Sequence, residues 1–301
     1  MNSPVVKPRD SSFGVLPGLR ESINAEQMLA VFAQTAFNRG FEFEVAAAFD
    51  RRQIRAPIYL SIGQEHVPAA IASAHRDWQI FAQHRAHSYY LSFGGNEEAL
   101  VDELLHRTTG CAGGMGGSAS IHHPPTRMFG HSGLMGDQVP IAVGAALVSQ
   151  RATLAVFGDA SAEEDYVFGA MGFAATKRAP VLFVCEDNDL SILTHVAVRR
   201  SWNVVAVARS FGLVAEDITD DPWLIVHHVQ ELVSRLPAFL NVRTCRQLWH
   251  AGTGHDGAPE WNRYELFKSA LTDVVERERV EGAEREAMSR ASRLWNERSQ
   301  K

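Results

Sequence analysis

The segment from residue 153 to residue 245 alternates short, continuous apolar runs with stretches of helical composition. The apolar runs are residues 153–157, 180–185, 213–218 and 239–245, and the expected helices between them are 163–176, 202–211 and 222–236. Continuous apolar strands are typical of a parallel sheet whose two faces are both covered by helices. The pattern therefore predicts an α/β fold with a doubly wound, mostly parallel sheet.

The flanking segments complete the expected organisation. Residues 1–23 have no hydrophobic period and are rich in Ser, Pro, Gly and charge, so we expect a flexible N-terminal arm. A helix is expected from Asn24, because Asn24 and Gln27 resemble a capping box. Further expected elements are helices at 63–74 and 141–150, a strand at 78–82 and a long charged helix from Tyr264. The proposed division is an arm (1–23), an α/β domain (24–263) and a C-terminal helical segment (264–301).

Composition excludes several functional classes. With 29 Lys+Arg against 35 Asp+Glu the net charge is −6, which argues against nucleic acid or an anionic membrane as a partner. No stretch approaches the ~20 apolar residues that span a bilayer. The three cysteines, Cys111, Cys185 and Cys245, are far apart, which disfavours a disulfide framework or a cysteine zinc site. We therefore expect a soluble, cytoplasmic protein.

Two oxygen-bearing side chains follow adjacent expected strands. Asp159 comes just after the run 153–157, and Asn188 comes just after the run 180–185. Ligands of open parallel sheets bind at the carboxyl ends of strands, and oxygen ligands suit Mg²⁺ or Ca²⁺. The alternative is that both residues cap the following helices, and these two residues alone favour capping.

Other polar and glycine-rich segments are less decisive. The segment 110–118 lacks a phosphate-loop pattern and leads into histidines and prolines instead of a helix. Its glycines would let the backbone approach a ligand closely or would form a flexible loop. The adjacent histidine pairs lack a third ligand at familiar zinc spacing. Arg85 and Arg246 follow strand-like runs, where each could grip a phosphate, although each alone is more often a surface ion pair.

Several motifs together resemble a known family. Gly158-Asp159 followed by Asn188, thirty residues after the glycine, resembles the thiamine diphosphate motif. In order along the chain stand YLSIGQE at 59–65, HRAH at 84–87, GMGGS at 114–118, GLMGDQVP at 133–140 and TCRQLWH at 244–250. From about residue 24 to 264, the chain resembles the alpha subunit of thiamine diphosphate-dependent 2-oxo acid dehydrogenases of the pyruvate, branched-chain and acetoin type.

The resemblance implies a fold of the thiamine diphosphate-binding type and a role for each matched residue. Asp159, Asn188 and the carbonyl of Leu190 fall on the ligands of Mg²⁺. Matched to cofactor contacts are His84, Arg85, Gly133, Met135, Gly158, Asp159, Ala160, Asn188 and Arg246. His250 matches a catalytic histidine on a mobile loop, and an unperturbed pKa near ~6.5 would let it relay a proton. Tyr59, the second expected catalytic residue, stands where the family has a histidine.

The resemblance also implies a reaction and partners. It points to decarboxylation of a 2-oxo acid and transfer of the acyl unit to a lipoyl-bearing or acyl-carrier protein. A separate beta subunit would complete the cofactor site in an α2β2 heterotetramer. Because Tyr59 is a large departure, transketolase-like transfer of a two-carbon ketol unit remains an alternative. A non-catalytic scaffold is a second alternative, against which the intact motif residues argue.

Overall fold

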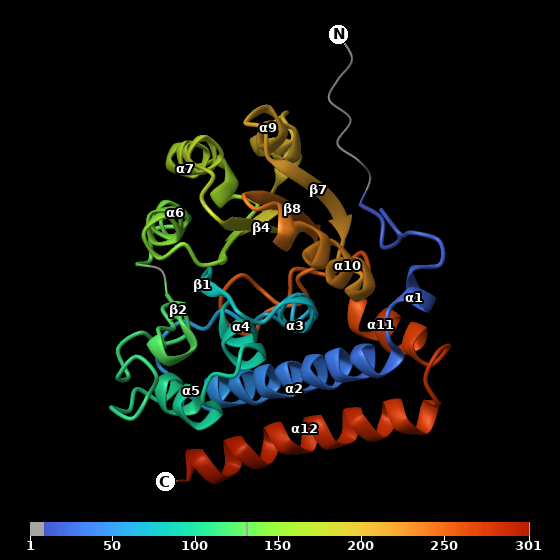
Figure 1. Ribbon diagram of the computed structural model, residues 1–301. Coiled ribbons are helices and arrows are strands. Elements are labelled where there is room, and N and C mark those ends of the chain that lie inside the picture. The colour runs from blue at the N-terminus through green and yellow to red at the C-terminus, as the bar shows by residue number, and fades with distance from the viewer. Residues whose placement is uncertain (1–8, 131, 301) are drawn as a thin grey trace.

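A sheet of six parallel strands forms the centre of the computed structural model, which describes residues 9–130 and 132–300 (Figure 1). Its strand order is β2-β1-β3-β4-β8-β7. The strands are β1 (Gln79–Phe81), β2 (Met128–Phe129), β3 (Thr153–Gly158), β4 (Val181–Asp187), β7 (Val214–Thr219) and β8 (Ala238–Arg243). The expected parallel α/β sheet is confirmed. The sequence pattern missed β2 because its two residues are too few to show a period.

Helices connect and cover these strands. They are α1 (Leu19–Ser22), α2 (Ala25–Asp50), α3 (His66–Ala74), α4 (His87–Ser92), α5 (Glu97–Leu104), α6 (Gln138–Ser149), α7 (Asp165–Lys177), α8 (Val196–Arg199), α9 (Val204–Ser210), α10 (Pro222–Leu232), α11 (Arg263–Leu271) and α12 (Arg277–Ser299). A small antiparallel hairpin, β5 (Leu190–Ser191) and β6 (Thr194–His195), follows β4. None of the helices in these described ranges is long and apolar enough to cross a membrane.

Each face of the sheet has its own apolar core. On β3, Ala155 and Phe157 pack with α6, α7 and α9, whereas Leu154 and Val156 pack in the larger core with α2, α3, α4 and α10. Successive side chains of a strand point to opposite faces, so a strand between two helical layers must be apolar at every position. This double burial explains the continuous apolar runs of the sequence.

The local start of two helices follows from specific side-chain contacts. Asn24 Oδ1 accepts hydrogen bonds from the N–H groups of Glu26 and Gln27, which confirms the expected start of α2. The Gln27 side chain donates to Ser73 Oγ (3.0 Å) instead of closing a capping box. Helix α3 begins at His66, later than expected, because Gly63 has a φ of +97°. A Cβ at Gly63 would collide with the carbonyl oxygen of Cys245, so this turn requires glycine.

The C-terminal segment forms two helices where the sequence predicted one. Residues 272–276 interrupt the helix between α11 and α12, where the β-branched residues Thr272, Val274 and Val275 lower helix propensity. Helix α12 then runs along α2 (Figure 1), and its fully buried Trp295 packs edge-on against Phe41 with ring centroids 5.8 Å apart.

Residues 9–22 contact the body of the protein at several points. The Arg9 guanidinium donates to the carbonyl of Thr244 (2.6 Å), and the carbonyl of Phe13 accepts from the N–H of Thr219 (3.1 Å). The first eight residues of the predicted arm lie outside the described residues. The boundary at residue 23 and the division into 1–23, 24–263 and 264–301 stay predictions.

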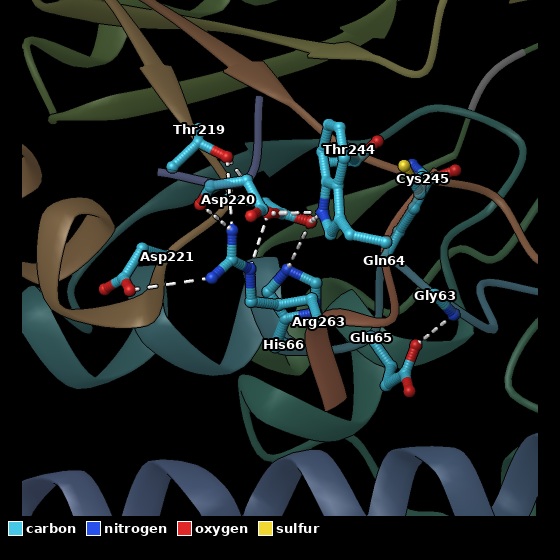
Figure 2. A network of polar contacts seen from close by, with 12 residues as sticks. Gly63, Gln64, Glu65, His66, Thr219, Asp220, Asp221, Thr244, Cys245 and Arg263 are labelled. Carbon is cyan, nitrogen blue, oxygen red and sulfur yellow. Dashed lines mark hydrogen bonds and ion pairs between the residues drawn. The ribbon is translucent and has the colours of Figure 1, made fainter. Parts of the chain in front are cut away.

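A buried ionic cluster ties the edge of the sheet to the C-terminal helices. Asp220, directly after β7, accepts from Arg263 Nε (2.6 Å) and from Trp261 Nε1 (3.0 Å), and its Oδ2 lies 3.3 Å from His66 Nε2. Figure 2 shows Asp220, His66 and Arg263 meeting from the end of β7, from α3 and from α11. We refer to Asp220, Arg263, Trp261 and His66 as the Asp220 cluster.

Candidate active site

One cavity of about 320 Å³ lies beyond the carboxyl ends of β1, β3, β4 and β8. The structure brings every predicted site residue into its wall: Tyr59, His84, Arg85, Gly133, Met135, Gly158, Asp159, Ala160, Asn188, Leu190, Arg246 and His250. Parallel strands end at the same edge of the sheet, which is why residues far apart in sequence meet here. The individual role of each residue stays a prediction.

Asp159 is buried at the end of β3, with 2% of its surface exposed. Its carboxylate forms an ion pair with Arg199, while Arg200 donates to its carbonyl oxygen (2.6 Å). Burial and the nearby Asp187 raise the pKa of Asp159 to about 7, against the opposing effect of the two arginines. The helix-capping alternative is wrong for Asp159, because the N-caps of the two helices that follow it are Ala160 and Glu164.

Asn188 is fixed in a turn between β4 and β5. Its Nδ2 donates to Gln64 Oε1 (3.0 Å), and its Oδ1 accepts from the N–H of Leu190 (3.1 Å). This turn leads into a hairpin strand, so Asn188 does not cap a helix either. Among the described residues no group of three or more His, Cys, Asp or Glu side chains could hold a metal ion. A metal at this edge would therefore depend on mixed carboxylate, amide and carbonyl oxygens, a set that suits Mg²⁺.

Two buried guanidinium groups give the cavity positive charge. Burial and the neighbouring Arg246 lower the pKa of Arg85 to about 10. Arg246 donates to Asp256 Oδ2 (2.7 Å) and to the carbonyl of Ile192 (2.7 Å), whereas its buried Nη1 has no hydrogen-bond partner among the described residues. Both arginines are buried, so the surface ion-pair alternative is wrong. Two close cations and an unused donor fit a dianionic ligand such as a diphosphate.

Tyr59, His84 and His250 form an aromatic group in the cavity wall. The Tyr59 ring lies edge-on to His84 (centroids 4.9 Å apart) and to His250 (5.7 Å). Arg85 donates to the carbonyl of His250 (2.9 Å) and lies 3.2 Å from its Nδ1. Burial, Arg85 and Arg246 lower the pKa of His250 to about 4. The assumption of an unperturbed pKa was therefore wrong, and the imidazole is neutral at pH 7 in this state.

Sequence reasoning missed six side chains at or beside the cavity. Gln83, Ala119, Ser161, Ser191 and Ile192 line it, and Arg199 reaches Asp159 from α8. Gln83 had a usable signal, because it directly precedes His84 and Arg85 after a strand. Arg199 had none, since its approach to Asp159 depends on how residues 190–200 fold back.

The glycine-rich segment is organised by an internal anion. Glu103 Oε2 accepts from the N–H groups of Ala112 (2.7 Å) and Gly114 (2.9 Å), and its Oε1 accepts from Gly116 (2.7 Å) and Gly117 (3.0 Å). The glycines thus allow close backbone approach, but to a buried side chain of the same protein. The close backbone approach expected from sequence is therefore to Glu103.

Comparisons with known proteins identify the family to which the chain belongs. The family described as the dehydrogenase E1 component matches residues 33–218. The mitochondrial pyruvate dehydrogenase E1 component subunit alpha of Dictyostelium discoideum is 32% identical over 171 residues, which cover 55% of this chain and 45% of that protein. The corresponding Rickettsia conorii subunit is 27% identical over 242 residues (75% and 73%). That of Rickettsia prowazekii is 26% identical over 268 residues (84% and 81%). The resemblance noted from the motifs is confirmed: the chain belongs to the dehydrogenase E1 component family.

Proposed function

We propose that the chain is the alpha subunit of a thiamine diphosphate- and Mg²⁺-dependent 2-oxo acid dehydrogenase. It would decarboxylate a 2-oxo acid and transfer the acyl unit to a lipoyl or other carrier thiol on a partner protein. The observation that carries this proposal is the single cavity that combines the oxygen ligands, the two arginines and the aromatic group. The names of the matched relatives support the same reaction class.

The residues present fit the cofactor and its metal. Arg85 and Arg246 would hold the diphosphate, and Asp159, Asn188 and the Leu190 carbonyl would hold Mg²⁺. His84, Gly133, Met135, Gly158 and Ala160 would contact the rest of the cofactor. When bound, thiamine diphosphate supplies a carbon nucleophile and takes up the electron pair released as the carbon–carbon bond breaks.

His250 and Tyr59 would act on the substrate. A neutral His250 imidazole has one N–H donor and one acceptor nitrogen, and a positioned N–H can pass a proton to a substrate oxygen. Arg85 can only donate, so Nδ1 accepts from it and the neutral ring carries its proton on Nε2, the atom left to donate to a substrate oxygen. The Tyr59 hydroxyl can donate to a substrate oxygen, since a phenol stays protonated near neutral pH. We infer that His250 holds or relays a proton and that Tyr59 determines which 2-oxo acid is accepted as substrate.

A beta subunit and a carrier protein are the proposed partners. We infer an assembly of two alpha and two beta subunits, with the beta subunit supplying the glutamate that activates the cofactor. A cytoplasmic location stays a prediction. The transketolase-like and scaffold alternatives are less favoured, because the matched relatives have names of pyruvate dehydrogenase subunits and the site residues are intact.

The test is reconstitution with a beta-like partner. We expect the complex to bind thiamine diphosphate with Mg²⁺ and to decarboxylate a 2-oxo acid such as pyruvate, but not to cleave a ketose phosphate. Asp159→Ala should stay folded but no longer retain the cofactor. The loss of cofactor-binding free energy should be several kcal/mol, whereas a lost helix cap costs about 1 kcal/mol of stability. Asp273→Ala, at an exposed site, is the control. The proposal would be contradicted if the complex turned over the ketose phosphate but not the 2-oxo acid, or if Asp159→Ala left the cofactor affinity unchanged.

A further inference from the structure

The backbone that carries Tyr59 is held by buried side chains. The N–H of Tyr59 donates to Ser118 Oγ (2.9 Å). Two residues further on, the N–H and hydroxyl of Ser61 donate to Glu42 Oε1 at 3.0 and 2.7 Å. Ser118 ends the glycine-rich segment, and Glu42 belongs to α2. Both ends of this three-residue stretch are therefore fixed by groups that do not line the cavity.

His87 joins these two anchors into one chain. Its Nδ1 lies 2.9 Å from Glu42 Oε2, and its Nε2 lies 2.9 Å from Ser118 Oγ. All three side chains are buried, with at most 2% of any residue exposed. A carboxylate accepts the Nδ1–H, which leaves Nε2 as the acceptor for the Ser118 hydroxyl. Ser118 Oγ then remains free to accept from Tyr59, so every group in the chain has a matched partner.

This arrangement ends at the cavity wall and not in the apolar core. Beyond the Tyr59 backbone, its ring lies against His84 and His250. A loss of the Ser118 hydroxyl would leave a buried N–H without an acceptor, and the backbone at residue 59 would move to find another. Such a shift would displace the phenol relative to a bound 2-oxo acid. Small errors in the position of a group that contacts the substrate have large effects on rate.

We propose that Ser118, His87 and Glu42 are positioning residues. They fix Tyr59 in the cavity wall and thereby determine which 2-oxo acid is accepted as substrate. This inference rests on the function proposed above. It assigns a purpose to the Ser118 end of the glycine-rich segment and to His87 of the HRAH motif. Neither residue touches the cavity.

The experiment compares Ser118→Ala with Tyr59→Phe in the reconstituted complex. For the preferred 2-oxo acid, Ser118→Ala should lower kcat/KM about tenfold, mainly through KM, and leave thiamine diphosphate affinity unchanged. The rate ratio between a small and a branched 2-oxo acid should shift in the same direction as in Tyr59→Phe. In a Tyr59→Phe background the Ser118 change should alter that ratio little further, and Ser118→Thr should restore it.

Thr35→Ala is the matched control, because it removes another buried hydroxyl of the same interior that bonds only the Val31 carbonyl among the described residues. A second measurement does not need turnover. In protein labelled with 3-fluorotyrosine, the Tyr59 fluorine resonance, assigned with Tyr59→Phe, should shift in Ser118→Ala and not in Thr35→Ala. An unmoved resonance overturns the positioning role whether or not the complex is active. An inactive wild-type complex with a shifted resonance would count against the proposed function instead. The positioning role would also be overturned if the effects of Ser118→Ala and Tyr59→Phe on the rate ratio were fully additive, or if Ser118→Thr did not restore that ratio.

Discussion

Two buried polar regions at the carboxyl edge of the sheet treat charge in opposite ways. In the Asp220 cluster, burial would raise the pKa of Asp220, but Arg263 and His66 hold it below its ordinary value. In the cavity, burial raises the pKa of Asp159 to about 7 and lowers those of Arg85 to about 10 and His250 to about 4. The first region favours the ionised carboxylate, whereas burial in the second shifts these three groups toward their neutral forms. A fold can thus use one set of ions for stability and keep another for ligands.

The largest effect is expected from breaking the Asp220 cluster. Asp220→Asn removes the closer of two carboxylates that pair with the buried Arg263 and leaves only Asp221, 3.6 Å away, which should cost up to about 3–5 kcal/mol of unfolding free energy. Urea denaturation followed by circular dichroism measures this loss. Asp273→Asn, at an exposed site, should unfold at the wild-type urea concentration. If both variants unfold together, the Asp220 cluster does not stabilise the fold.

The next effect concerns catalysis in the cavity. His250→Ala should lower turnover of the reconstituted complex about 10²-fold, because one positioned acid or base is lost, and should leave cofactor affinity nearly unchanged. Steady-state kinetics and a cofactor titration separate the two. The nearby His255 is exposed, and His255→Ala serves as the control. Equal losses of turnover and cofactor affinity would instead make His250 a binding residue.

A smaller effect should sharpen the role of Arg199. The guanidinium of Arg199 neutralises Asp159, so a divalent cation must replace that ion pair before it can bind there. At pH 8, Arg199→Gln should therefore lower the Mg²⁺ concentration needed for half-maximal thermal stabilisation by a few-fold, with Mg²⁺ alone as the ligand. Arg293→Gln, in the exposed part of α12, is the control. A higher Mg²⁺ requirement would mean that Arg199 supports the metal instead of competing with it.

The smallest effect is the pH dependence of stability contributed by His250. Its pKa is about 4 in the folded chain and near ~6.5 when unfolded, so the unfolded state binds more protons between these values. Its contribution is therefore present above about pH 6.5 and lost as the pH falls toward 4. Wild type should lose stability more steeply than His250→Asn over this window, as measured by urea denaturation at several pH values. Parallel curves would show that His250 titrates normally in the fold.

The sequence predicted the parallel strands and the residues at their ends, because both depend on local apolar runs and on short motifs. It did not predict the pairing of Asp159 with Arg199, or the contact of Ser118 with Tyr59, because these depend on loops that fold back over long sequence distances. The shift in the His250 pKa was missed for a related reason. It arises from burial beside Arg85 and Arg246, which only the assembled cavity creates.

The position of α12 along α2 has a consequence for how the chain folds during synthesis. Helix α2 emerges early, with large aromatic side chains such as Phe41 on the face that α12 later covers. Because synthesis proceeds from the N-terminus, this face stays uncovered until residues 277–299 have left the ribosome. The larger core is therefore completed only after the sheet and its cavity have been made. During that interval the nascent chain exposes aromatic side chains that promote aggregation. A chaperone that covers them should therefore raise the yield of folded protein.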